Sequence, residues 1–330
     1  MNKEPKQLTY QKILQPIEKP LQNVEDILLK KLTTDIHLLT EVSQYILSAG
    51  GKRFRPALLL LAAGSMGRID HKACVTAAVV EYIHTATLLH DDVVDNADFR
   101  RSKKAARSIW GNEASVLVGD YLFTISFQLL SEFEDPKLIA ELSHATTLMA
   151  KGEIIQLERE NDNTTEEEYL KIIHYKTASL IGTATKLGGM IAEASTDQQN
   201  ALYDCGINIG MAFQMIDDAL DYDIKNANTG KDKGTDLKER KITLPLSHLL
   251  KNASEKDKNS VTEILNMDVI TDDHVKEVCH LMGRYNSINY VLERARTFSE
   301  KAKSNIASFP DTDYKSGICN LADFVISRKK

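Results

Sequence analysis

Apolar side chains recur every three or four residues along most of the chain, and this spacing predicts amphipathic α-helices. The alternation of β-branched and polar residues that is typical of strands is scarce, and only 7 prolines and 16 glycines interrupt the pattern. We therefore predict an all-α protein. No shift in composition marks a boundary, so we predict one helical domain over residues 1–330.

Polar connections separate the predicted helices. Ten of the helices are expected near residues 13–32, 36–47, 113–131, 138–157, 166–187, 244–250, 260–265, 273–282, 288–307 and 317–328. Further helices carry or follow the charged motifs described below. The polar stretches Ala97–Gly111 and Asp223–Thr243 are predicted as loops, and Thr165 is predicted to cap the helix that begins at Glu166.

Composition narrows the class of protein further. The net charge of −6 argues against a nucleic-acid-binding surface. The four cysteines are widely scattered without a CxxC pair, which argues against a zinc site or disulfides and fits a reducing compartment. The first ten residues lack the apolar core of a secretory signal, and the longest apolar run, Ala57–Ala63, is too short to cross a bilayer. We predict a cytoplasmic protein.

The stretch Glu81–Arg101 runs from apolar residues into three carboxylates, Asp91, Asp92 and Asp95. Asp91 and Asp95 are four residues apart, so they share one face of a helix, where like charges repel each other. Mg²⁺ relieves this repulsion because it binds a few carboxylates together with substrate phosphates. Two arginines follow at positions 100 and 101, and arginine suits bidentate contact with phosphate. Alternatively, this is a solvated helix end with a surface arginine pair.

A second copy of this motif makes chance an improbable explanation. Gly206–Asp223 again runs from an apolar helix into three carboxylates, Asp217, Asp218 and Asp221, 126 residues after the first motif. Gln214 lies on the same helical stripe as the outer two carboxylates. We expect the two motifs to face each other across a helical bundle and to chelate a shared cluster of Mg²⁺ and diphosphate.

Two other stretches are basic enough to bind phosphate. Gly50–Pro56 (GGKRFRP) places Lys52 and Arg55 beside the N-terminus of the next helix, where phosphate is favoured. The polar stretch after the second Asp motif contains Lys231 and Lys241 and is predicted to be a mobile flap that closes over phosphates. A solvated basic loop is the alternative in both cases.

The ordered segments GGKRFRP, HTATLLHDDVVDNADFRR, GEIIQL, KTASL, GMAFQMIDDALDYD and GKDKGTDLKERKITLP resemble the trans-isoprenyl diphosphate synthases. Within that family the chain looks most like the bacterial long-chain, octaprenyl-type synthases, and the similarity covers roughly residues 20–300. The resemblance implies an all-α bundle around a deep central cavity, usually in a homodimer, and a Mg²⁺-dependent prenyltransferase.

The resemblance also assigns roles to residues. Mg²⁺ ions, two or three of them on the allylic diphosphate, are assigned to Asp91, Asp92, Asp95, Asp217, Asp218 and Asp221. Contacts to the same diphosphate are assigned to Arg100, Lys176, Thr177, Gln214, Lys231 and Lys241. The diphosphate of isopentenyl diphosphate is assigned to Lys52, Arg55, His84 and Arg101. The chain departs from the family at Ser102 and Arg240, where glycine is common.

The implied reaction condenses an allylic diphosphate, farnesyl diphosphate or shorter, with successive isopentenyl diphosphates. Short-chain synthases carry aromatic residues where this chain has Ala86 and Thr87, so the resemblance implies a product of about C35 to C50. Octaprenyl diphosphate for a quinone side chain is favoured, and such a product would associate with a membrane. Phe123 and Phe127 are candidates for the floor of the cavity.

Four other classes of protein are alternatives to a long-chain synthase. A farnesyl or geranylgeranyl diphosphate synthase would share the chemistry but stop earlier. A class I terpene cyclase would pair one Asp-rich motif with a different second metal motif, and a non-catalytic regulatory subunit would usually lack one motif. A calcium-binding protein would need interleaved Asp and Gly in a 12-residue loop, which the sequence lacks.

Overall fold

The computed structural model describes residues 9–48, 51–100, 103–158, 164–223 and 234–328. In these ranges the only strands are β1 (Phe99–Arg100) and β2 (Lys103–Lys104), which pair antiparallel, and helices make up nearly all the rest. The prediction of an all-α protein is confirmed.

The chain divides into two compact units, which are described separately. Unit 1 comprises residues 1–146, 180–206 and 305–321, and unit 2 comprises residues 147–179, 207–304 and 322–330. Unit 1 contains α1 (Tyr10–Leu14), η1 (Gln15–Ile17), α2 (Glu18–Lys30), α3 (His37–Ser48), α4 (Phe54–Ser65), α5 (His71–Val94), β1, β2, α6 (Ala106–Ser131) and nearly all of α9 (Ser179–Ile191). Unit 2 contains α8 (Glu166–Ile173), the π-helical turn η2 (His174–Ala178), α11 (Thr235–Lys238), α12 (Leu244–Asn252), α13 (Glu255–Leu265) and α14 (Asp272–Arg284). Residues of both units occur in α7 (Pro136–Glu158), α10 (Thr196–Asp221), α15 (Ser287–Asn305) and α16 (Asp313–Ser327).

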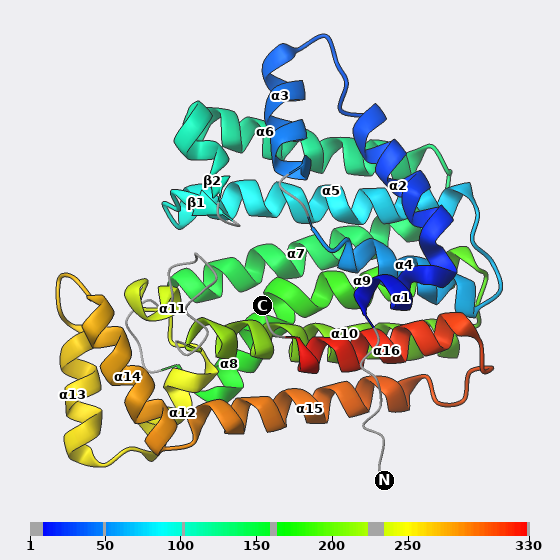
Figure 1. Cartoon of the computed structure of the whole chain (residues 1–330). Coiled ribbons are helices and arrows are strands. Elements are labelled where there is room, and N and C mark those ends of the chain that lie inside the picture. The colour runs from blue at the N-terminus through cyan, green and yellow to red at the C-terminus, as the bar shows by residue number, and fades with distance from the viewer. Residues whose placement is uncertain (1–8, 49–50, 101–102, 159–163, 224–233, 329–330) are drawn as a thin grey trace. The chain divides into compact units, whose positions relative to one another are not determined.

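Helix α5 is the core of unit 1. Asp70 caps its N-terminus by accepting a hydrogen bond from the Ala73 amide at 3.0 Å. Most of its side chains are buried, as expected for a helix that is apolar on nearly all sides. Helix α6 runs beside it (Figure 1), and a Cβ atom at Gly119 would lie 2.3 Å from the His90 ring, so glycine allows this close approach.

Helix α6 begins earlier than the sequence predicts. Residues Ala106–Gly111, predicted as part of a loop, form its first turns, and the break falls at Gly111, where φ is 88° and only glycine is unstrained. Among the described residues, α6 is the one helix whose length and mean hydropathy, 1.3, would suffice to cross a membrane. Of its most apolar 18-residue window, 44% is buried within the protein.

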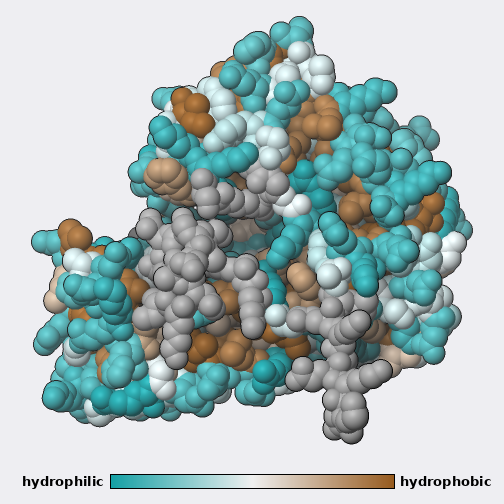
Figure 2. All heavy atoms as spheres, viewed as in Figure 1, coloured by the Kyte–Doolittle hydropathy of each residue, from teal (hydrophilic) through white to brown (hydrophobic). Residues whose placement is uncertain are grey.

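In unit 2, α12, α13 and α14 pack around a separate apolar cluster. Its fully buried members include Leu246, Leu249, Val261 and Val278. The outer surfaces of α13 and α14 are mostly hydrophilic (lower left in Figure 2), as amphipathic helices with one buried face should be. These helices form where the sequence predicts them, with ends that differ by a few residues.

Two local predictions in unit 2 have different outcomes. Thr165 caps α8 as predicted, in a capping box with Glu168. The single helix predicted over residues 166–187 is instead divided by η2, because the hydrogen bonds widen to the π pattern at His174–Ala178. Helix α11 lies inside the stretch Asp223–Thr243 that was predicted as a loop, of which residues 224–233 lie outside the described ranges.

Candidate active site

The first Asp motif ends α5, and its carboxylates differ in burial. Asp92 is 1% exposed, whereas Asp91 and Asp95 are half-buried. The helix repeat explains the difference, because residues four apart share a face while the next residue points about 100° away. The outer pair is therefore the more accessible pair.

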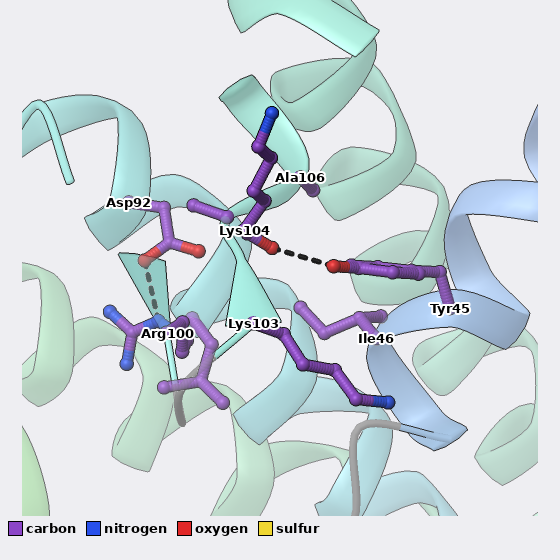
Figure 3. A pocket seen from close by; sticks show the side chains of 9 residues that line it. Tyr45, Ile46, Asp92, Arg100, Lys103, Lys104 and Ala106 are labelled. Atoms are coloured by element: carbon purple, nitrogen blue, oxygen red, sulfur yellow. Dashed lines mark hydrogen bonds and ion pairs between the residues drawn. The ribbon is translucent and has the colours of Figure 1, made fainter. Parts of the chain in front are cut away.

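Arg100 is held against the buried carboxylate of this motif. Its Nε donates a hydrogen bond to Asp92 Oδ1 at 2.5 Å (Figure 3). Burial raises the pKa of the Asp92 carboxyl, and the Arg100 guanidinium opposes that rise. A small pocket of about 20 Å³ lies here, beside Tyr45, whose hydroxyl donates to the Lys104 carbonyl at 2.8 Å. The structure thus joins Arg100 to the first Asp motif.

The three cations of GGKRFRP have different environments. Arg53 adopts a left-handed conformation, with φ 47°, directly before α4. Its guanidinium donates to Glu25 at 2.5 Å and to Glu81 at 3.1 Å, so its charge is already paired. Lys52 is exposed and Arg55 half-buried, and these are the two that the resemblance assigns to a diphosphate.

The residues assigned to product length and to isopentenyl diphosphate lie further back on α5. Ala86 is fully buried and Thr87 half-buried, and the Thr87 hydroxyl donates to the carbonyl of His84, itself half-buried, at 2.8 Å. On α6, the half-buried rings of Phe123 and Phe127 contact each other with centroids 5.5 Å apart.

The second Asp motif repeats the burial pattern of the first. Asp217 is exposed, Asp221 is half-buried and Asp218 is 5% exposed. The Tyr169 hydroxyl donates to Asp218 Oδ2 at 2.6 Å, and Gln214 Nε2 donates to Asp218 Oδ1 at 2.8 Å. Burial raises the pKa of the Asp218 carboxyl to about 7, although these two hydrogen bonds lower it.

A fourth carboxylate, missed at the sequence level, joins the second motif. The backbone amide of Asp236, in α11, donates to Asp221 Oδ2 at 3.0 Å. Burial raises the pKa of the Asp236 carboxyl well above its usual value, and the charges of Asp218 and Asp221 add to the rise. Asp236 lies in the polar stretch Asp223–Thr243, in which the resemblance assigns roles only to lysines. Its distance from the second Asp motif depends on how that stretch folds.

Lys176 lies in η2 and is paired rather than solvated. Its Nζ contacts Glu153 Oε2 at 2.6 Å and Gln156 Oε1 at 2.8 Å, two residues three apart on α7. Gly152 allows this approach, since a Cβ there would lie 2.9 Å from the Lys176 backbone nitrogen. Beside it, the Thr177 hydroxyl donates to Gln214 Oε1 at 2.8 Å, which links η2 to the second Asp helix.

Arg328, near the C-terminus, is a second residue that sequence reasoning missed. Its Nη2 donates to the Phe213 carbonyl at 2.8 Å and lies 3.5 Å from Asp217 Oδ1. The guanidinium also stacks over the Phe213 ring, 4.0 Å from its centroid. A cation is thus positioned next to the most exposed carboxylate of the motif. No sequence spacing connects positions 328 and 217.

Arg101, Ser102 and Lys231 lie outside the described residues. Lys241 is half-buried, with its Nζ 2.9 Å from Glu239.

Arg240 takes a left-handed conformation, with φ 56°, which explains why glycine is common at this position. Its guanidinium donates to the carbonyls of Leu265 at 3.1 Å and Met267 at 2.6 Å, and these bonds offset the backbone strain.

The donor set of both motifs fits Mg²⁺. Each motif presents two accessible carboxylates one helical turn apart, and Mg²⁺ favours oxygen ligands. Within the described ranges, no three Asp, Glu, His or Cys side chains form a ready-made metal cage. Mg²⁺ takes one or two carboxylates from a protein and completes its shell with water and substrate phosphates.

The chain is similar to known proteins over nearly its whole length. The octaprenyl diphosphate synthase of Haemophilus influenzae is 37% identical over 309 residues, which cover 93% of this chain and 94% of the relative. The crystal structure of a decaprenyl diphosphate synthase from Rhodobacter capsulatus is 35% identical, with a TM-score of 0.90 and coverage of 96% and 98% of the two chains. A polyprenyl synthase structure from Caulobacter crescentus is 34% identical, with a TM-score of 0.94 and coverage of 99% and 100%.

The all-α fold with Asp-rich motifs on two of its helices is that of the isoprenoid synthases. The sequence matches the Polyprenyl synthetase family over residues 36–282, in agreement with the resemblance of its motifs. The chain belongs to the polyprenyl synthetase family and is a prenyltransferase.

Proposed function

We propose that the protein is a long-chain trans-polyprenyl diphosphate synthase, which acts as one synthase domain. It condenses an allylic diphosphate, farnesyl diphosphate or shorter, with successive isopentenyl diphosphates, to a product of about C35 to C50 with octaprenyl favoured. A quinone side chain is the expected use of that product. The main support for this proposal is the pair of Asp motifs, each with two accessible carboxylates and a buried third. The chain is also similar over its length to octaprenyl diphosphate synthase.

The residues divide between two diphosphates. Lys52, Arg55, His84 and Arg101 bind isopentenyl diphosphate, and Arg100, Lys176, Thr177, Gln214, Lys231 and Lys241 bind the allylic diphosphate together with the two Asp motifs. The pairing of Lys176 with Glu153 supports this role, because it fixes the direction of a side chain that would otherwise be mobile.

Bound Mg²⁺, two or three ions, supplies electrostatic stabilisation for a departing diphosphate. The accessible outer carboxylates of each Asp motif would hold it, a narrower set than the six that the resemblance assigns, because Asp92 and Asp218 are buried. The structure of the Caulobacter crescentus synthase, complexed with calcium and isoprenyl diphosphate, supports such a site. The cationic side chains orient the two substrates so that the alkene of isopentenyl diphosphate attacks the allylic carbon. Loss of a proton to the released diphosphate then completes the condensation.

The residues before the first Asp motif support a long product. Ala86 and Thr87 are small, and aromatic side chains at these positions would obstruct a growing chain. Phe123 and Phe127, which contact each other, are the candidate floor.

We further propose a cytoplasmic homodimer whose product associates with a membrane. Helix α6 supports the dimer, because three apolar side chains of this apolar helix, Ile109, Val116 and Leu117, are exposed.

One assay tests the proposal: purified protein, Mg²⁺, farnesyl diphosphate and labelled isopentenyl diphosphate, with products resolved by length. The expected result is turnover to a product of about C35 to C50. A product that stops at C15 or C20 would replace the long-chain assignment with a short-chain one. Absence of turnover unless a second protein is added would instead identify a regulatory subunit.

A further inference from the structure

Tyr169 is a buried residue that has no assigned role in binding metal, diphosphate or the growing chain. It lies in α8, is 3% exposed, and its hydroxyl donates to Asp218 Oδ2 at 2.6 Å. In this contact the hydroxyl is the donor and the carboxylate oxygen is the acceptor. The contact therefore has one direction, from α8 to the second Asp motif.

Asp218 receives a donor on each of its two oxygens. Tyr169 donates to Oδ2 and Gln214 to Oδ1, so the plane of the carboxylate is fixed from both sides. A buried carboxylate requires such donors, because an unsatisfied buried polar group costs roughly 1–3 kcal/mol. The two neighbouring carboxylates, Asp217 and Asp221, lie about 100° and about 60° round the helix from Asp218, on the same side of it, and are more exposed.

The same network continues into η2. Gln214 donates to Asp218 and accepts from the Thr177 hydroxyl at 2.8 Å, and Thr177 adjoins Lys176. The orientation of Asp218 is thus coupled by hydrogen bonds to the turn that carries the proposed diphosphate contacts. Tyr169, on a different helix, is the last member of this network, through its hydrogen bond to Asp218.

We propose that Tyr169 is a positioning residue for the second Asp motif: its hydroxyl keeps Asp218 turned inward, so that Asp217 and Asp221 are the carboxylates presented to Mg²⁺. This role rests on the proposed function, since it requires a divalent ion at the motif. Asp218 then fixes the orientation of the motif without being a direct ligand.

The test replaces Tyr169 by Phe, which removes only the hydroxyl. Loss of a partner of this kind typically weakens metal affinity about 10- to 100-fold. We expect the affinity for Mn²⁺ in the presence of inorganic diphosphate, measured by electron paramagnetic resonance, to fall by about tenfold or more. The Mg²⁺ concentration for half-maximal turnover should rise in parallel, while the KM for isopentenyl diphosphate stays unchanged.

Tyr82→Phe is the matched control. Tyr82 is fully buried and its hydroxyl donates to the Leu28 carbonyl at 2.8 Å, in unit 1 and away from the second Asp motif along the chain. This variant loses a comparable buried hydrogen bond and should bind Mn²⁺ as the wild type does. Unchanged Mn²⁺ affinity in Tyr169→Phe, or an equal loss in both variants, would overturn the proposal.

Asn substitutions provide a second test that does not depend on the folding of Tyr169→Phe. Asp217→Asn and Asp221→Asn should weaken Mn²⁺ binding more than Asp218→Asn does. If Asp218→Asn weakens it as much as either, Asp218 is a ligand and the positioning role is wrong. Mn²⁺ binding is measured without turnover, so a wild-type protein that binds Mn²⁺ and diphosphate but forms no prenyl product refutes only the proposed function.

Discussion

In both Asp motifs the burial of each carboxylate follows from the helix repeat. The middle residues, Asp92 and Asp218, are 1% and 5% exposed, and each accepts a hydrogen bond from a side chain outside its own turn or helix. Their partners differ, since Arg100 is a cation and Tyr169 is neutral. The two motifs therefore share a geometry but not an electrostatic environment.

Loss of one outer carboxylate should nearly abolish turnover. Asp91→Ala and Asp217→Ala each remove an accessible oxygen ligand, and we expect the rate to fall by several orders of magnitude in steady-state assays of isopentenyl incorporation. Chelation of Mg²⁺ should have the same effect. Asp273→Ala, on the exposed surface of α14, is the control and should retain full activity. Near-normal turnover in either motif variant would exclude a metal role for that motif.

The two diphosphate sites should separate kinetically. Lys176→Ala should raise the KM for the allylic substrate, whereas Lys52→Ala and Arg55→Ala should raise the KM for isopentenyl diphosphate. A charge-assisted contact contributes roughly 1.5–3 kcal/mol, so changes of about ten- to a hundredfold are expected. Kinetics with the opposite substrate dependence would show that the two sites are exchanged.

Product length should respond to the side chains before the first Asp motif. Ala86→Phe should shorten the product sharply, and Phe123→Ala or Phe127→Ala should lengthen it, as resolved by chromatography of the dephosphorylated products. Because Ala86 is fully buried, the melting temperature of the Ala86→Phe variant must be measured. Thr87→Phe, at the half-buried neighbour, provides a variant with less overpacking. Unchanged product length in both Phe variants would place the growing chain elsewhere.

At this scale the sequence predicts residue types better than residue partners. The spacing of the Asp residues was sufficient to predict which pairs share a face. It could not show that Arg53 is neutralised by Glu25 and Glu81, because those residues lie 28 positions away in either direction. Asp236 and Arg328 were missed for the same reason: long-range folding brings each to the second Asp motif.

At the level of elements, the contact between α7 and η2 positions Lys176. Gly152→Ala would place a methyl group 2.8 Å from Tyr175 Cβ and 2.9 Å from the Lys176 backbone nitrogen. We expect a lower melting temperature, from an overpacking cost of about 1–3 kcal/mol, and a higher KM for the allylic substrate. Calorimetry and steady-state kinetics measure the two effects.

Gly283→Ala is the matched control for that substitution. Gly283 lies in α14 with nothing within 4 Å of a new Cβ, so alanine should stabilise the protein by about 0.5–1 kcal/mol. If Gly152→Ala behaves like Gly283→Ala, the close approach does not constrain Lys176.

Periodicity predicted most helices, but not where a helix changes its hydrogen-bond pattern. Residues 166–187 have an unbroken helical repeat, and η2, which packs against α7, lies within it. The first turns of α6 were predicted as part of a loop, because polar residues and Gly111 interrupt the apolar repeat there. Thr165 was predicted correctly because a capping box is a local signal.

At the level of the whole molecule, the exposed apolar side chains of α6 indicate that the protein self-associates. Leu117 is 67% exposed on this apolar helix, and burial against a second copy would remove that surface from water. We expect a homodimer by light scattering, and Leu117→Glu should shift it toward monomer. Thr124→Glu, at an exposed polar position of the same helix, is the control for the added charge. A monomeric wild type would refute the proposed dimer.

The division of the chain into interleaved segments has a consequence for its synthesis. Domains commonly fold as they leave the ribosome, N-terminal ones first. Here unit 1 is complete only with residues 305–321 and unit 2 only with residues 322–330, so unit 1 needs the first part of α16 and unit 2 needs its end. Nascent chains stalled anywhere before the last helix should therefore remain protease-sensitive and depend on chaperones, and a premature stop codon near the 3′ end of the gene should be as damaging as one in the middle.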